Sequence, residues 1–234
     1  MRFIYDRIKY GKESVEDPLY ANENSYGRIE VKDSCSGCGK CSLECPVGAV
    51  KLKNGKARVD DKSCIYCGKC IDACSQGAIS NSHEYRLADL EIAGDELRKN
   101  IYKKFNRSLV LRSVDTGSCN ACMLELSAMS NNYYSLSRYG IEFAASPRHA
   151  DGIIVTGPVA INMKEALIKA YGAMAEPKIV IAAGACAHDG GIFKDSYGVV
   201  NILSEIIPVD LTIPGCPPSP QALIYGLLKL LDRV

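Results

Sequence analysis

The sequence predicts a two-part α/β chain, in which a small cysteine-rich segment precedes a flavodoxin-like domain built on a parallel sheet. Eight of the twelve cysteines fall in an internal repeat between residues 34 and 79, and from residue 109 short apolar runs alternate with helical stretches. The 234 residues are 47% hydrophobic and 24% charged, which is ordinary for a globular protein and excludes a disordered or fibrous chain.

The charge balance and the cysteine content exclude several classes of protein. Lys and Arg number 28 against 27 Asp and Glu, so the net charge of +1 provides no field for gathering nucleic acid. No apolar stretch is long enough to span a bilayer, and no secretory leader follows Met1. Because disulfides are rare in the cytoplasm, we expect a cytoplasmic metal protein rather than a disulfide scaffold.

The cysteine repeat carries the first motif. Residues 34–50 and 63–79 are identical at nine of 17 positions, and each copy has the spacing C-x2-C-x2-C-x3-C. Three thiolates with this spacing can surround one corner of a cubane cluster, whereas the fourth reaches the neighbouring cluster. The predicted ligand sets of two 4Fe–4S clusters therefore cross. They are Cys35, Cys38, Cys41 and Cys74 for one cluster, and Cys64, Cys67, Cys70 and Cys45 for the other.

The alternative for this repeat is a pair of zinc sites. Zinc usually takes two cysteine pairs separated by a longer spacer, which does not match a run of three with a fourth close behind. Over about residues 30–80 the segment resembles the bacterial two-cluster ferredoxins. We therefore predict a two-cluster ferredoxin domain at residues 34–80, after an N-terminal arm at residues 1–33 that shows no clear periodicity.

A linker at residues 81–108 is expected to form a helix that packs the two domains together. Leu90, Leu97, Ile101 and Phe105 lie on a plausible helical stripe.

The domain predicted at residues 109–234 has strands and helices in succession. Short apolar runs predict buried strands at 109–111, 141–144, 153–155, 178–181 and 209–213, and helical periodicity predicts helices near 120–131, 162–175 and 219–232. This alternation favours a parallel sheet with helices on both faces.

The remaining cysteines each follow a predicted strand. Cys119 and Cys122 follow the first strand, Cys186 the fourth and Cys216 the fifth. The carboxyl ends of parallel strands meet at one edge, so four thiolates there can hold a third 4Fe–4S cluster. The alternatives are that these cysteines are simply buried, or that the turn at residues 116–118 cradles a flavin phosphate.

Four blocks around these cysteines carry a resemblance to a known family. They read TGSCNACMLEL, ASPRHADGIIVTGPV, GACAHDGGIF and IPGCPPSPQAL, in that order, within a match over about residues 107–232. They resemble the small subunit of the group 4 NiFe-hydrogenases, the formate hydrogenlyase and energy-converting type, which is related to the B-type subunit of complex I. In complex I the first two cysteines are adjacent, so the separation of Cys119 from Cys122 favours the hydrogenase branch.

The resemblance implies that the last four cysteines bind the proximal cluster, beside the active site of a large subunit. No cysteine is left to ligate nickel, so this chain has no catalytic residue of its own and the NiFe site lies on the partner. We therefore expect an oxidoreductase subunit that carries electrons through three 4Fe–4S clusters between a ferredoxin-like donor or acceptor and the large subunit. Membrane-arm subunits would hold the complex on the cytoplasmic face of the membrane.

Two alternatives remain open. The chain could be the B-type subunit of a complex I-like, quinone-reducing module, or a free iron–sulfur electron carrier. Three other residues carry smaller hypotheses. Glu125 is a candidate for proton traffic or a carboxylate that satisfies the helix dipole. His188 could tune a cluster or be a loop histidine with no special role, and Arg148 could bind a partner carboxylate or hold its own loop.

Overall fold

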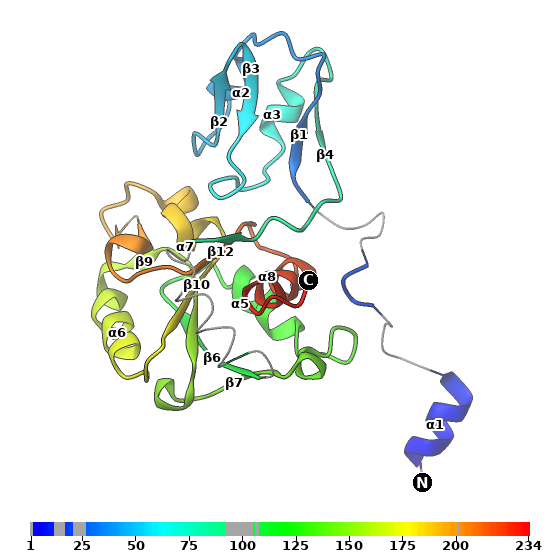
Figure 1. Ribbon diagram of the computed structural model, residues 1–234. Coiled ribbons are helices and arrows are strands. Elements are labelled where there is room, and N and C mark those ends of the chain that lie inside the picture. Colours follow the sequence, from blue (N-terminus) through cyan, green and yellow to red (C-terminus); the bar gives the residue numbers. More distant parts are fainter. Residues whose placement is uncertain (1, 12–16, 21–26, 92–104, 106–107, 201) are drawn as a thin grey trace.

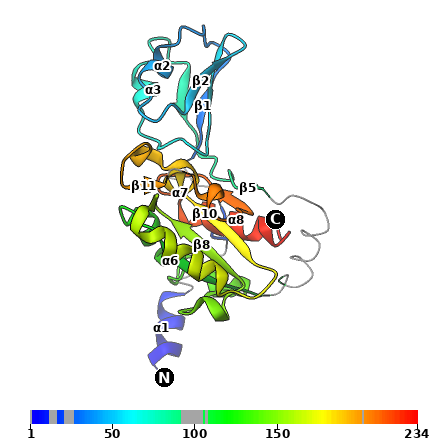
Figure 2. The same cartoon turned by 90° about the vertical axis from the view of Figure 1, so that its left-hand side faces the viewer.

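The computed structural model describes residues 2–11, 17–20, 27–91, 105, 108–200 and 202–234. They form two units, a cysteine-rich unit (residues 28–82) and a sheet unit (residues 85–234). Figures 1 and 2 show the cysteine-rich unit beyond one edge of the large sheet, on the side where α7 and the loop after β12 lie. Helix α1 (Arg2–Tyr10) lies apart from both.

The cysteine-rich unit consists of two small antiparallel sheets and two one-turn helices. Strand β1 (Ile29–Val31) pairs with β4 (Ile79–Asn81), and β2 (Val50–Lys53) pairs with β3 (Lys56–Val59). The two copies of the repeat each form one helix. These helices are α2 (Lys40–Leu43) and α3 (Lys69–Asp72), preceded by Gly39 at φ 80° and Gly68 at φ 78°. Only glycine adopts this left-handed turn without strain, so the repeat encodes two equivalent helix starts.

The sheet unit is built on six strands. Their order across the sheet is β5 (Asp89–Leu90), β12 (Leu211–Ile213), β10 (Ile179–Ala183), β8 (Gly152–Thr156), β6 (Leu109–Asp115) and β7 (Ile141–Phe143). All neighbours are parallel except β5, which runs antiparallel to β12. The five parallel strands follow the flavodoxin-like order 2-1-3-4-5, which confirms the predicted fold class.

Helices cover both faces of this sheet, as predicted. Helices α5 (Ala121–Ala128) and α8 (Pro220–Leu230) lie on one face, and α6 (Ile161–Gly172) and α7 (Ala185–Asp189) on the other (Figures 1 and 2). The strands alternate accordingly. Ile154 and Ile181 belong to the core with α5 and α8, whereas the next residues along the strands, Val155 and Ala182, belong to the core with α6 and α7. Both faces are therefore buried.

A small ribbon of β9 (Val159–Ala160) and β11 (Val199–Val200) flanks α6.

The predicted limits of the arm and the linker need correction. Strand β1 lies in the predicted arm, yet it pairs with β4 and so belongs to the cysteine-rich unit. In the predicted helical linker, Asp89–Leu90 is a strand, because the edge of β12 offers unpaired backbone groups that β5 satisfies. Linker positions 92–104 and 106–107 lie outside the described residues, and Phe105 of the predicted stripe is buried in the core of the sheet unit.

Within the described part of the chain, no helix is both long and apolar enough to cross a bilayer.

Candidate metal centres

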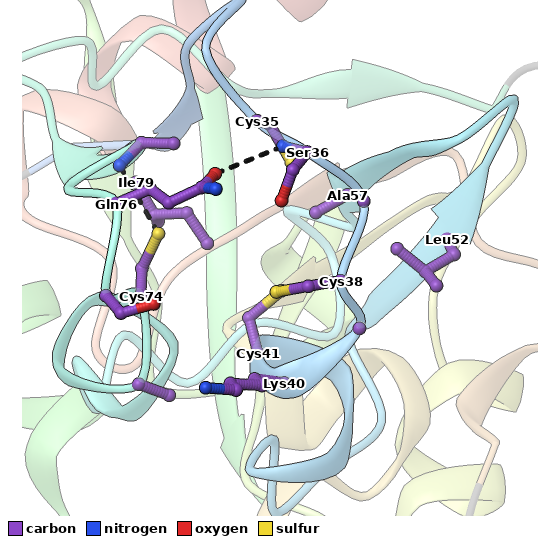
Figure 3. A pocket seen from close by; sticks show the side chains of 15 residues that line it. Cys35, Ser36, Cys38, Lys40, Cys41, Leu52, Ala57, Cys74, Gln76 and Ile79 are labelled. Atoms are coloured by element: carbon purple, nitrogen blue, oxygen red, sulfur yellow. Dashed lines mark hydrogen bonds between the residues drawn. The ribbon is translucent and has the colours of Figure 1, made fainter.

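Four cysteines of the cysteine-rich unit line one cavity. They are Cys35, Cys38, Cys41 and Cys74, three from the first copy of the repeat and one from the second. Figure 3 shows Cys74 approaching this space from the side opposite the other three.

Hydrogen bonds hold the walls of this first cavity. Cys41 is buried in α2, and Cys74, just after α3, accepts a hydrogen bond at its Sγ from the backbone N–H of Ala78 at 3.3 Å. The backbone N–H of Ser36 donates to Oε1 of Gln76 at 3.3 Å, which ties the two copies of the repeat together (Figure 3). These contacts therefore hold Cys74, from the second copy of the repeat, in the wall of the cavity that the first copy forms.

A second cavity is lined by the other four thiols of the repeat. They are Cys45, Cys64, Cys67 and Cys70. Its apolar lining includes Ile29 and Val50, and the backbone N–H of Tyr66 donates to Cys64 Sγ at 3.4 Å. Burial raises the pKa of Cys64 to about 11. A thiol in this setting stays protonated at neutral pH until a metal displaces the proton.

The last four cysteines gather at the carboxyl edge of the sheet. Cys119 lies in the loop after β6, Cys122 in the first turn of α5, Cys186 in α7, and Cys216 in the loop after β12. Burial is the main reason that the pKa of Cys122 rises to about 12, and the charges of the other three thiols raise it further. These four side chains therefore lie close to one another.

Two glycines make room for the thiols at this edge. Gly184 has φ +93°, and a Cβ built there would lie 2.9 Å from Cys122 Sγ. A Cβ at Gly191 would lie 2.8 Å from Cys186 Sγ. Any side chain at either position would push on a sulfur, so both glycines keep the space around the thiols open.

Among the described residues, no three His, Cys, Asp or Glu side chains converge closely enough to hold one metal ion. The eight thiols of the repeat line two cavities, four to each. Four thiolates for each site is the ligand number of a cubane cluster.

The second and third centres face each other across the interface between the units. Cys216 packs against the apolar core of the cysteine-rich unit. Burial raises the pKa of Cys216, and the charges of Cys119 and of Cys67 in the second centre raise it further. Tyr66, between two thiols of the second cavity, lines an interface pocket with Gly215 and Pro217 on either side of Cys216. The second centre also lies near the first. Burial is the main cause of the raised pKa of Cys70, and the charge of Cys41 in the first centre adds to it.

An ion-pair cluster joins the two units beside these centres. Lys62 Nζ, from the cysteine-rich unit, lies 2.7 Å from Asp89 Oδ2 and 3.0 Å from Glu91 Oε1. Thr212 Oγ1, on β12, donates to the same oxygen of Glu91 at 2.6 Å. Glu91 therefore links the cysteine-rich unit to the large sheet.

The other predicted residues lie at the margins of the centres. Glu125 is half-buried on α5, and burial raises its pKa. His188 is half-buried in α7; its charge adds a minor part to the lowering of the pKa of Glu91, which comes mainly from hydrogen bonds with Thr212 and Lys62. Arg148 is exposed, and its backbone N–H donates to Ser146 Oγ at 3.3 Å. Of these, only His188 is connected to the ion-pair cluster.

Sequence reasoning missed the groups that join the centres. Lys62, Glu91 and Thr212 come together over separations of 29 and 121 residues, and no local pattern signals such contacts. The cationic hairpin at residues 50–59 was also missed, although its signal was readable. Asn54-Gly55 stands between two strand-like runs, and such a pair marks a two-residue hairpin.

Two family models match the chain. The NADH ubiquinone oxidoreductase 20 kDa subunit model matches residues 119–230, and a 4Fe–4S dicluster domain matches residues 28–75. The two matches contain all the cysteines of the three centres.

Individual relatives match the second part of the chain. Formate hydrogenlyase subunit 7 of Escherichia coli (strain K12) is 41% identical over 135 residues, 58% of this chain and 53% of that protein. The B-type subunit of the NADH-quinone oxidoreductase of Geobacter metallireducens is 50% identical over 113 residues, 48% of this chain and 66% of that protein. The chain thus spans about half to two thirds of these relatives.

A solved structure shares the fold. A chain of the membrane-bound sulfane sulfur reductase, an archaeal respiratory membrane complex, aligns with a TM-score of 0.50 and 32% identity, covering 58% of this chain and 74% of that chain.

Proposed function

The chain belongs to the NADH ubiquinone oxidoreductase 20 kDa subunit family, with a 4Fe–4S dicluster domain before the family domain, and from this premise we propose that it is an electron-transfer subunit of a hydrogenase-type complex. It carries electrons through three 4Fe–4S clusters between a ferredoxin-like donor or acceptor and an active site on a large subunit. The observation that carries this proposal is the grouping of twelve free cysteines into three sets of four.

The ligand sets in this proposal are those of the three centres. The first cluster takes Cys35, Cys38, Cys41 and Cys74; the second takes Cys45, Cys64, Cys67 and Cys70; the third takes Cys119, Cys122, Cys186 and Cys216. Four thiols for each site, the two cavities and the glycines that leave the third open all fit cubane clusters. Bound clusters would supply one-electron redox chemistry at each site.

The order of the centres supports a single path. Cys41 of the first centre lies near enough to Cys70 of the second for their charges to interact, and the same holds for Cys67 of the second centre and Cys216 of the third. The protein holds the ligands in place and surrounds them with apolar side chains. Backbone N–H groups, such as those of Ala78 and Tyr66, donate to ligand sulfurs and so tune the cluster potentials.

The partners in this proposal are a large subunit that carries the NiFe site and membrane-arm subunits that hold the complex on the cytoplasmic face of the membrane. All twelve cysteines are assigned to clusters, so none remains for nickel. Two exposed apolar side chains that follow ligands of the third centre support a partner subunit on this surface. Leu124 on α5 is 63% exposed, and Ile192 after α7 is 57% exposed. A subunit packed on this edge would bury both.

One alternative has a specific observation in its favour. The chain is 50% identical to the B-type subunit of an NADH-quinone oxidoreductase, against 41% to the formate hydrogenlyase subunit, which favours a complex I-like, quinone-reducing module. Against it stands the two-residue separation of Cys119 from Cys122, in contrast to the adjacent pair of complex I. A free carrier is the third possibility, and it would require no partner on the exposed edge.

Anaerobic purification of the native complex tests these functions together. The proposal expects about 12 iron and 12 sulfide per copy of this chain, with a large subunit in the complex and hydrogen turnover coupled to ferredoxin. Quinone reduction without hydrogen turnover would favour the complex I-like module, and reduction of sulfane sulfur would point to a third acceptor. A stable monomer without partners would identify a free carrier, and about eight iron would contradict the third cluster.

A further inference from the structure

The β2–β3 hairpin of the cysteine-rich unit presents four cations on one face. Residues 50–59 contain two lysines on β2, a lysine and an arginine on β3, and no carboxylate. In the register of the hairpin, Lys51 lies opposite Arg58, and Lys53 lies opposite Lys56. Since side chains alternate along a strand, all four side chains share one face, and all four residues are exposed.

This arrangement is unfavourable for the isolated hairpin. Like charges directly opposite each other on two strands destabilise the pair. Asp33 offsets one of them, because its Oδ1 lies 2.7 Å from Lys56 Nζ. Within the part of the chain that the structure describes, Lys51, Lys53 and Arg58 form no ion pair. An anionic surface brought from outside would relieve this repulsion.

The opposite face of the same hairpin borders the first cysteine cavity. Leu52 and Ala57 line that cavity together with Cys35 and Cys38. The backbone N–H of Ala57 is directed at the thiol of Cys35, and it is the main cause of a lowered pKa there. Only the thickness of a two-stranded sheet therefore separates the cations from the first centre, which lies at the end of the path farthest from Cys216.

We propose that the cationic face of the β2–β3 hairpin docks an acidic electron-carrier protein, which exchanges electrons with the first cluster. The inference rests on the proposed function and assigns the outer end of the path to this face. In each transfer the reduced carrier loses one electron and the cluster gains it, with no bond made or broken.

A carrier protein fits this face better than other anionic partners do. The face sits directly over a redox centre, which serves an electron donor but has no use for a phosphate backbone. Lipid binding needs apolar side chains to insert, and the cationic face carries none, because the half-exposed Leu52 lies on the opposite face, beside the cavity. Electrostatic steering by the cations would also raise the rate of encounter.

Stopped-flow reduction of the purified, cluster-loaded chain tests the proposal. The probe is a reduced, acidic bacterial two-cluster ferredoxin, and the readout is the second-order rate constant for bleaching of the clusters at low ionic strength. We expect the double variant Lys51→Gln/Lys53→Gln to react about tenfold more slowly than the wild type, because steering by charge is lost. The difference should vanish near ~1 M salt, where the screening length is about 3 Å.

A matched variant and a second reductant make the result specific. Lys164→Gln/Lys169→Gln removes two exposed cations from α6 and should leave the ferredoxin rate unchanged. A small photoreductant without net charge should reduce all variants equally. Because the hairpin variant relieves like-charge repulsion, its thermal midpoint should not fall.

Other outcomes would overturn the inference. Equal ferredoxin rates in the wild type and the hairpin variant would do so, as would a loss equal to that in the α6 variant. A change confined to the cluster potential would assign the cations to redox tuning, and a loss of binding to phosphatidylglycerol vesicles alone would assign them to a membrane. A chain with no clusters for the photoreductant to bleach would instead contradict the proposed function itself.

Discussion

Lys62 Nζ lies 3.0 Å from Glu91 Oε1, and this contact ties the cysteine-rich unit to the large sheet. Glu91 is held in place from the other side by Thr212, and Glu91 N donates to the carbonyl of Asp210 at 2.8 Å. Lys62 lies shortly before Cys64 of the second centre, and Thr212 shortly before Cys216 of the third. The ion pair therefore orients one unit of the path against the other.

Replacing Lys62 with Met should loosen this orientation. We expect the magnetic interaction between the second and third clusters, seen by electron paramagnetic resonance, to weaken, and the free energy of unfolding to fall by about 1 kcal/mol at most. All three clusters should remain. The matched control is Lys169→Met on α6, which breaks an exposed pair with Glu165 of 2.7 Å and should leave the spectrum unchanged. An unaltered spectrum in both variants would show that the pair does not orient the units.

The same carboxylate predicts a dependence on pH. Burial raises the pKa of Glu91, but hydrogen bonds from Thr212 and Lys62 and the charge of Lys62 outweigh burial, so the pKa is lower than its ordinary 4.5. A carboxyl group with a lowered folded-state pKa stabilises the protein above its unfolded pKa, and this contribution is lost as pH falls through the folded-state pKa. The urea midpoint should therefore fall on acidification below about pH 5.

The variant Glu91→Gln isolates this contribution, since it keeps the shape of the side chain without the charge. Its midpoint should be lower than that of the wild type at neutral pH and should approach it in acid. Two pH profiles that run parallel throughout would refute the linkage.

Gly184→Ala should remove the third cluster selectively. The added methyl group would lie 2.9 Å from Cys122 Sγ, and the residue would have to keep a φ of +93° that Ala strongly disfavours. We expect iron to fall from about 12 to about eight per chain, with both clusters of the cysteine-rich unit retained. Gly172→Ala, at the end of α6 with open space around its Cα, serves as the control. It should keep all the iron and gain about 0.5–1 kcal/mol of stability; full iron in Gly184→Ala would contradict the role of that glycine.

Replacing one ligand from each unit should separate the clusters. Cys216→Ser is expected to leave two reducible clusters and to abolish electron flow to the large subunit, because no thiol of the sheet unit lines the first two cavities. Cys74→Ser should damage both clusters of the repeat, since each copy supplies a ligand to the other, while the third cluster survives. Electron paramagnetic resonance distinguishes the outcomes. Loss of all signals in Cys216→Ser would show that the two units do not load independently.

The cysteine spacing and the strand pattern, read from the sequence, anticipated much of this protein. Ligand spacing is local, so the two copies of the repeat predicted which thiols would share a cavity, including the exchange of Cys45 and Cys74. The alternation of apolar runs predicted the parallel sheet because each strand is buried on both faces, and it placed the last four cysteines at one edge. The family resemblance carried by the blocks around them is confirmed by the family model over residues 119–230.

The relation between the units was decided only by the tertiary structure. Asp89–Leu90 forms a strand in place of the predicted linker helix because the edge of β12 offers it a partner. That partner is more than 100 residues away along the chain, so helical periodicity contains no sign of it. For the same reason, the sequence predicted two clusters in the repeat without indicating which one faces Cys216. That order is a property of the packed interface, where Lys62, Glu91 and Thr212 meet, and contacts between residues so far apart along the chain form only when the surfaces of both units come together.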